Sequence, residues 1–261
     1  MKKVTVGIIL VFLAFLASSY FRNEGPSLFG GKKTGITNRV NVSWEIENSK
    51  VTFVMKDSEG KQMRGLNDTF QNELRAVVVG ETLEDYKEVQ PDAKGAGTFT
   101  FPYEFSSKKT YTIFLYIDDG TSQEQFARTE VLAADKADEQ QGTAKPALQL
   151  DPLLTTKTAS YEMSFIFNTL KAQQQESLTF QFQARKDSSA RFQFSPKKSS
   201  RLLIVDENRK HFFAVVPAEH EQEKRMQYTV IFPEEGLYKI WAVFYLNGKK
   251  YERPFVVRVT K

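Results

Sequence analysis

The sequence predicts an all-β protein, with two tandem β-sandwiches that follow an N-terminal signal peptide or membrane anchor. Three observations predict this fold class. Short segments alternate apolar and polar residues in both halves of the chain, turn-forming residues separate these segments, and the same series occurs twice in the same order. With 41% hydrophobic residues and 22 phenylalanines among 261 residues, the chain can fill compact cores.

Residues 1–22 are expected to direct the chain out of the cytoplasm. Two lysines precede the apolar run Val4–Phe21, which is the charged-then-apolar layout of a secretory signal. The small residues Ala17 and Ser19 would allow cleavage after Ser19, but the run also reaches the roughly 18 residues that a membrane anchor needs. Both alternatives export the rest of the chain. Residues 23–38 are rich in glycine and polar residues and are predicted to form a flexible tether.

The first sandwich is predicted over residues 39–132. Val42, Trp44 and Ile46 alternate with polar residues, as one face of a half-buried strand does. RAVVV at 75–79 indicates a further strand. Turn signals and later strands follow at DSEG (57–60), KKTYTIFLYI (108–117), DDG (118–120) and FARTEV (126–131).

The second sandwich is predicted over residues 159–261, where the same series returns. Tyr161, Met163 and Phe165 repeat the first alternating strand, and RLLIV at 201–205 repeats RAVVV. The remaining matches are EEGLYKIWAVF (234–244), the NG turn (247–248) and YERPFV (251–256). Residues 133–158 lack apolar periodicity and are predicted to be the linker between the two copies.

A tyrosine near the end of each copy favours the immunoglobulin-like type of sandwich. Tyr238 follows two acids and a glycine, and it resembles the corner tyrosine whose hydroxyl bonds back to the backbone in such domains. Tyr111 has the same place in the first copy. Ile240 and Ile113 occupy the positions of the disulfide cysteine of antibody domains. Since the chain has no cysteine, it has no disulfide, no cysteine metal site and no lipid-attachment thiol.

The charge of the chain argues against nucleic acid as a partner. The formal net charge is only +4, which is smaller than the basic excess of most nucleic-acid-binding proteins. Basic residues on predicted turns have two interpretations: they meet an anionic component of the cell envelope, or they keep the edges of the sheets soluble. These residues are Lys197, Lys198, Arg201, Lys249 and Lys250.

The second copy resembles the exported bacterial domains of the YtkA-like type. The resemblance rests on RLLIVDENRKHFFAVVP and on FPEEGLYKIWAVFYLNGKKYERPFVVRV, and it covers residues 160–260 better than 40–132. It implies an extracytoplasmic bacterial location. Members of that family typically show a histidine-rich segment before a proline, and histidines two apart on a strand can hold a metal ion. This chain has Ala214 and Val216, and in the first copy Glu88 and Gln90, at those places.

The two histidines of the chain are the candidates for a metal site. His211 and His220 would have to converge with a third ligand, Glu219 or Glu221, to hold an ion. A metal-handling protein of the copper type is therefore the alternative function. Solvated histidines are the simpler interpretation, and the prediction is that the protein has no cofactor.

Catalytic motifs are absent from the sequence. There is no GxSxG elbow, no P-loop and no GxGxxG segment after a strand. The acidic pairs Asp118–Asp119 and Glu234–Glu235 are predicted to be solvated turn residues. An enzyme of unrecognised type is the third hypothesis.

The leading hypothesis is a non-catalytic binding protein of the bacterial cell envelope, exported or membrane-anchored. Immunoglobulin-like domains often bind through loops at the ends of their strands. The equivalent loops of the two copies run from Gly80 to Asp85 and from Asp206 to Lys210. The partner would be a protein or an anionic envelope component, with the membrane as a further contact if the first segment is not cleaved.

Overall fold

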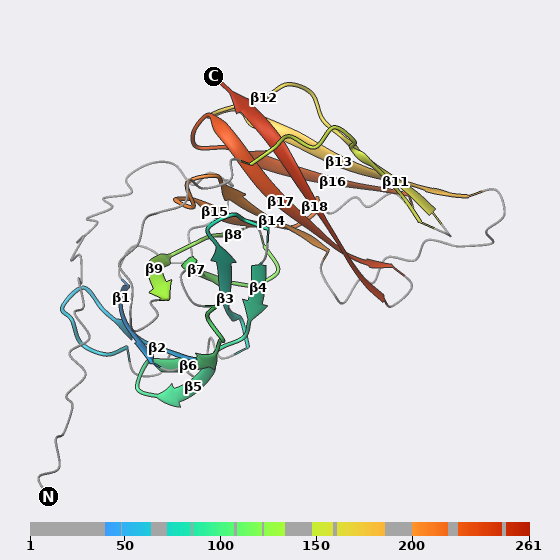
Figure 1. Cartoon of the computed structure of the whole chain (residues 1–261). Helices are drawn as coiled ribbons and strands as arrows, with labels where there is room; N and C mark the ends of the chain where they lie inside the picture. Colours follow the sequence, from blue (N-terminus) through green and yellow to red (C-terminus); the bar gives the residue numbers. More distant parts are fainter. Residues whose placement is uncertain are drawn as a thin grey trace, which may run out of the picture.

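The computed structural model describes most of the two predicted sandwiches, and every regular element in the described part is a β-strand (Figure 1). The predicted leader and tether lie outside the described residues, as does most of the predicted linker. The described ranges are 40–47, 49–63, 72–84, 86–106, 109–121, 123–133, 148–158, 161–185, 200–218, 224–246 and 249–261. The predicted all-β class is confirmed.

The N-terminal sandwich consists of two antiparallel sheets of four strands each. The outer sheet has the order β1 (Asn41–Glu47), β2 (Lys50–Lys56), β6 (Thr98–Pro102), β5 (Asp92–Gly95). The inner sheet has the order β4 (Tyr86–Val89), β3 (Leu74–Gly80), β7 (Lys109–Ile117), β9 (Ala127–Ala133). Fully buried Phe53, Phe99 and Ile113 are part of the core between them.

The C-terminal sandwich has one sheet of four strands and one of six. The outer sheet has the order β10 (Thr155–Lys157), β11 (Tyr161–Ile166), β13 (Gln175–Ala184), β16 (Arg225–Ile231). The inner sheet has the order β12 (Leu170–Lys171), β18 (Lys249–Thr260), β17 (Gly236–Leu246), β14 (Arg201–Asp206), β15 (Phe212–Val215), β8 (Gln123–Glu124). Strand β10 lies within the range predicted as linker, and it pairs with β11. The core between the two sheets includes stacked Phe165 and Phe180, whose ring centroids are 4.4 Å apart.

The tandem character of the chain is confirmed by the strand register. In the first copy Val77 of β3 lies opposite Phe114 of β7. In the second copy Leu203 of β14, which has the same place in the repeat, lies opposite Trp241 of β17. The two halves therefore repeat a fold as well as a sequence pattern.

Both predicted tyrosine corners are present. The hydroxyl of Tyr238 donates to the carbonyl oxygen of Glu234 at 2.9 Å. In the first copy the hydroxyl of Tyr111 instead accepts a hydrogen bond from the backbone N–H of Ser106 at 3.0 Å. Each bond ties the start of a central strand to the loop before it, which supports the immunoglobulin-like type of sandwich.

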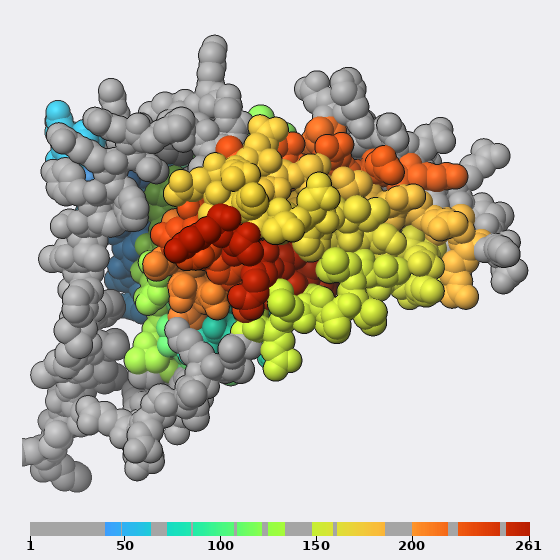
Figure 2. Space-filling view, turned by 90° about the horizontal axis from the view of Figure 1, so that it is seen from above, coloured from blue at the N-terminus to red at the C-terminus, as the bar shows by residue number. Residues whose placement is uncertain are grey.

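The four sheets form a stack of four layers, with an apolar cluster between each pair of neighbours. The N-terminal sandwich lies below the C-terminal one in Figure 1, and β3, β4 and β7 face β14 and β15. Seen from above, the surface is formed mainly by the C-terminal sandwich (Figure 2). Since the two inner sheets are covered on both faces, RAVVV and RLLIV are continuous apolar runs rather than alternating ones.

Candidate functional site

The interface between the two sandwiches combines buried aromatic side chains with a network of charged side chains. Its apolar part is a closed cluster to which both sandwiches contribute five buried residues. The N-terminal sandwich supplies Val77, Val79, Leu83, Phe114 and Tyr116, and the C-terminal sandwich supplies Leu203, Val205, Phe212, Ala214 and Trp241. None of these ten side chains is more than 4% exposed, so this is a core rather than a wet contact between domains.

Aromatic rings cross the interface in two places. Tyr86 of β4 packs against Trp241 of β17 with ring centroids 4.7 Å apart. Phe212 of β15 packs against Phe114 at 5.4 Å and against Tyr116 at 5.1 Å. Such pairs contribute about 0.5 to 1.5 kcal/mol each beyond the area that they bury.

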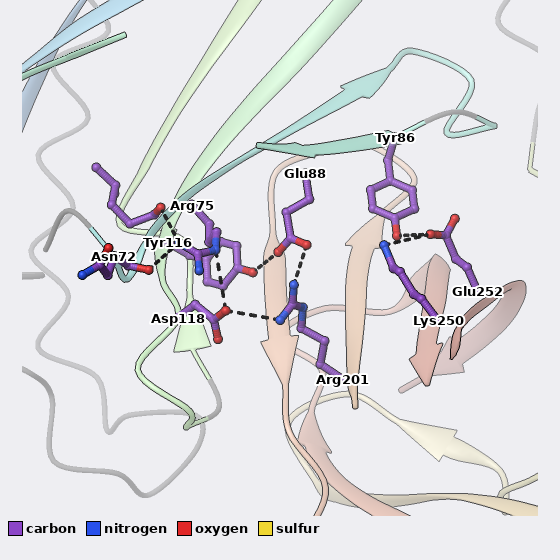
Figure 3. Close-up of polar contacts among 10 residues, drawn as sticks. Asn72, Arg75, Tyr86, Glu88, Tyr116, Asp118, Arg201, Lys250 and Glu252 are labelled. Carbon is purple, nitrogen blue, oxygen red and sulfur yellow. Dashed lines mark hydrogen bonds and ion pairs between the residues drawn. The ribbon is translucent and has the colours of Figure 1, made fainter. Parts of the chain in front are cut away.

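A network of charged side chains lies beside this cluster (Figure 3). Arg201, from the second sandwich, donates to the carboxylate of Glu88 and, at 3.2 Å, to Asp118 Oδ2, both from the first. Tyr116 donates its hydroxyl proton to the other oxygen of Glu88. Since the Arg201 side chain is only 12% exposed, its charge must be compensated inside the interface, and the two carboxylates do so.

The equivalent arginine of the first copy joins the same network. Arg75 Nε lies 3.7 Å from Asp118 Oδ2, and its Nη1 donates to the carbonyl oxygens of Asn72 and Leu74 at 2.7 and 3.0 Å. One carboxylate is thus shared by two arginines that have equivalent places near the start of β3 and β14. The shared carboxylate holds the ends of these two strands together across the interface.

Two further contacts extend the interface. Tyr86 donates its hydroxyl proton to Glu252 Oε2 of β18 at 2.6 Å, and Lys250 lies 3.7 Å from the same oxygen. Strand β8 of the first sandwich pairs with β15 of the second, so the inner sheet contains backbone from both sandwiches. Next to it, Gln125 accepts from the N–H of Phe212 at 2.5 Å and donates to the carbonyl of Lys210 at 3.0 Å.

The environment changes the pKa values of Tyr86, Tyr116 and Arg201. Burial, followed by the neighbouring carboxylates Glu252 and Glu88 respectively, raises the pKa of Tyr86 and of Tyr116 well above the ordinary tyrosine value. Burial alone would lower the pKa of Arg201, but the negative groups around it, Tyr116 when ionised together with Glu88 and Asp118, raise it. At neutral pH the arginine is therefore charged and both tyrosines are protonated donors.

We expect the interface to weaken at alkaline pH. Because the folded protein raises the pKa of Tyr116 and Tyr86 above the unfolded value of about 10, their contribution to stability is complete below that pH and is lost as the pH rises through the folded values. The free energy of unfolding in urea should therefore fall with pH above about 10. Tyr116→Phe should make this fall shallower. Ionisation of all ten tyrosines near pH 10 in the folded protein, seen by ultraviolet absorbance, would contradict this prediction.

The two predicted binding loops lie at this interface. Gly80 is half-buried at the end of β3, Leu83 is buried in the interface cluster, and Asp85 lies outside the described residues. Asp206 is buried and closes the second loop, where its carboxylate accepts from the backbone N–H groups of Asn208 at 3.0 Å and His211 at 2.6 Å. Lys210 is exposed, and its Nζ lies 3.7 Å from Glu234.

Three of the five predicted basic residues, Arg201, Lys249 and Lys250, lie in the described part of the chain. Lys249 and Lys250 are exposed on β18, whereas Lys197 and Lys198 lie outside the described residues. Arg201 was predicted to belong to this basic surface, but the structure places it in the interface, where the two carboxylates offset the cost of burying its charge.

The acidic residues predicted to lie in solvated turns have different environments in the structure. Asp118, expected in solvent, is a half-buried member of the network, whereas Asp119 accepts from the N–H of Thr121 in the turn. Glu234 and Glu235 are exposed, and Glu235 lies 3.6 Å from Lys261.

The candidate metal ligands are only partly described. His211 Nε2 lies 3.8 Å from Glu234 Oε1, while His220, Glu219 and Glu221 lie outside the described residues. Within the described ranges no three His, Cys, Asp or Glu side chains gather closely enough to hold a metal ion. The same part of the chain contains no helix long and apolar enough to cross a membrane.

Two of the four positions where the family resemblance would place histidines lie in the interface. Ala214 is part of the apolar cluster, and Glu88 binds Arg201. Sequence reasoning did not find Glu88, Tyr116 or Arg75 as a site. The sequence signal that could have indicated the interface is the pair of continuous apolar runs, RAVVV and RLLIV. Strands that are apolar on both faces need a second layer to cover them.

Comparison with known proteins gives one domain family and a set of structures. Residues 156–261 match a domain of unknown function, DUF8832, and no curated protein matches the chain. An adhesin of Escherichia coli, FdeC, is 15% identical, with 85% of this chain and 64% of that chain covered and a TM-score of 0.23. A segment of two fibronectin type III domains from chicken tenascin is 13% identical, with 84% and 97% covered and a TM-score of 0.23.

A tetra-tandem repeat from the extending region of a large adhesion protein is 8% identical, with 84% of this chain and 48% of that chain covered and a TM-score of 0.26. This chain thus spans less than two thirds of either adhesion protein. These identities and TM-scores are too low to assign a function or a partner to this chain.

Proposed function

We propose that this chain is a non-catalytic binding protein of the bacterial cell envelope, in which two joined sandwiches present their outer surfaces to a partner. Residues 1–22 are the export signal or membrane anchor, and residues 23–38 are the tether. The charged-then-apolar start of the sequence supports this layout. The resemblance of the second copy to YtkA-like exported domains supports the bacterial envelope as the location.

One observation carries the proposal. Arg201, a largely buried cation of the second sandwich, binds the carboxylates of Glu88 and Asp118 of the first across the interface. Perturbed ionisable groups at an enzyme's active site normally face a space where substrate can enter. Here Arg201 and Tyr86, whose pKa values are raised, donate to carboxylates of the other sandwich. The contribution of this site is therefore to hold the two sandwiches in one arrangement.

The surfaces that remain for a partner are the outward faces of the two outer sheets. On β13 and β16 this face carries one cation, Arg225, among neutral polar side chains: Ser177, Thr179, Gln181, Gln183, Gln227 and Thr229. On β1 and β2 a small depression is lined by Glu45, Glu47, Lys50 and Thr52. These side chains stand on sheets whose other faces are packed in cores, and a rigid support of this kind suits a binding surface.

Site-specific photo-crosslinking in the native envelope tests the proposal. A photoreactive residue at Gln181 or at Glu45 of the full chain reports on one outer face each, and a probe at exposed Glu59, in a turn, is the matched control. We expect a discrete adduct from at least one outer face and none from the control. The absence of an adduct from either outer face would contradict the proposal. One equivalent of copper or zinc in the envelope protein would also contradict it and would favour the metal-handling alternative.

A further inference from the structure

The interface is built from the same positions of the two copies. The register of β3 with β4 matches that of β14 with β15, since Val77 lies opposite Glu88 and Leu203 opposite Ala214. Three of the five first-sandwich residues in the cluster have equivalents that also belong to it, and Tyr86, which packs against the cluster, corresponds to its member Phe212. Leu83 and Tyr116 correspond to Arg209 and Val243, which are not part of the cluster. The equivalent pairs are Val77 and Leu203, Val79 and Val205, Leu83 and Arg209, Tyr86 and Phe212, and Phe114 and Trp241.

The aromatic contacts across the interface are reciprocal. Tyr86 of the first sandwich contacts Trp241 of the second. Phe212, the equivalent of Tyr86, contacts Phe114, the equivalent of Trp241. In a two-fold symmetric contact, residue i of one partner meets residue j of the other and j meets i. The two aromatic pairs satisfy this condition within one chain.

The loops beside these strands follow the same symmetry. Leu83 and Arg209 occupy equivalent places and share a left-handed backbone, with φ of 55° and 56°. Left-handed φ is uncommon for residues other than glycine, so its occurrence at both places marks a conserved turn geometry within the chain. Both side chains are buried, at 0% and 3% exposure.

We propose that the interface is isologous, which means that the two sandwiches contact each other through equivalent faces. The partner that this face fits is therefore a second copy of the same sandwich. The chain is then a covalently linked pseudo-dimer around a local two-fold axis. This inference goes beyond the proposed function and does not depend on it. It assigns the β3, β4 and β7 face, and its counterpart on β14, β15 and β17, to self-association.

The polar network departs from this symmetry, because the equivalents of Glu88, Tyr116 and Asp118 in the second copy are Ala214, Val243 and Tyr245. Arg201 binds Glu88, but the equivalent of Glu88 in the second copy is Ala214. Arg75, the equivalent of Arg201, therefore lacks that carboxylate and contacts Asp118 and two backbone carbonyls. If the interface is isologous, a carboxylate placed at position 214 will face Arg75 as Glu88 faces Arg201.

A double-mutant cycle on the full chain tests this expectation. Ala214→Glu is combined with Arg75→Met, and the free energies of unfolding of the two single variants, the double variant and the natural chain are compared. We expect Arg75→Met to lower the folding equilibrium constant about tenfold more in the Ala214→Glu background than in the natural one. No coupling between positions 75 and 214 would overturn the proposal.

Two further variants keep the test decisive. Ala242→Glu is the matched control, because Ala242 is a buried alanine of the same sheet that faces the core of the C-terminal sandwich instead. Ala242→Glu should destabilise the chain equally in the natural background and in the Arg75→Met background. If Ala214→Glu does not fold, Ala214→Gln, which buries no charge, takes its place in the same cycle. Failure of both to fold would mean that position 214 does not face a cation, and the proposal would be wrong.

Discussion

Replacing Trp241 with alanine is expected to lower the free energy of unfolding by about 3 to 5 kcal/mol, the usual range for a buried tryptophan. The side chain is 2% exposed and packs against Tyr86 across the interface. Removing it leaves a cavity in the cluster that both sandwiches share. We expect the two sandwiches to lose their common unfolding transition as well as stability.

Fluorescence makes this separation measurable because the chain has only two tryptophans. In Trp241→Ala the remaining Trp44, which packs against Phe53 in the N-terminal sandwich, reports on that sandwich alone. Circular dichroism reports on both. We expect urea transitions that coincide in the natural chain and diverge in the variant. Trp44→Ala is the control outside the interface. Coincident transitions with a loss below about 1 kcal/mol would show that the interface cluster contributes little to stability.

Replacing Arg201 with methionine is the second change with a large expected effect. Methionine keeps most of the apolar stem but leaves Glu88 without its cation and Asp118 with Arg75 alone. Breaking a buried ion pair by removing one partner costs about 3 to 5 kcal/mol, because an uncompensated charge remains. We expect a loss in this range in urea unfolding, and partial recovery on adding Glu88→Gln, which removes the stranded charge.

The equivalent arginine is the matched control for this variant. Arg75→Met should cost less, because the 3.7 Å contact of Arg75 with Asp118 is longer and its remaining bonds go to nearby backbone carbonyls. Lys249→Met, at an exposed position, should change stability by no more than about 0.5 kcal/mol. Equal losses for Arg201 and Arg75 would mean that the network does not favour one arginine over the other.

Local patterns were sufficient to predict the class of each sandwich. Alternation such as that of Tyr161, Met163 and Phe165 depends on a strand having one buried face, and the corner tyrosine Tyr238 bonds within its own loop. Both signals arise from residues close together in the chain. They could therefore be interpreted without knowing what the sandwich packs against.

The interface depended on information that no local pattern contains. Arg201 was interpreted as a surface residue because a charge after a polar turn usually lies in solvent. Its burial requires Glu88 and Asp118, which come from the other copy and are far away in the sequence. The location of the loops at 80–85 and 206–210 likewise depends on how the two sandwiches pack, which no local pattern indicates.

The sequence by itself determined that the chain repeats one β-sandwich unit, since period-two alternation and turn residues act within a few residues of one another. Only the tertiary structure decided that the two units pack through equivalent faces and that Arg201 belongs to this interface. The physical reason is that burying a charge is costly unless it is compensated. Whether Arg201 lies in water or in a core therefore depends on carboxylates that only the packing of the two sandwiches brings to it.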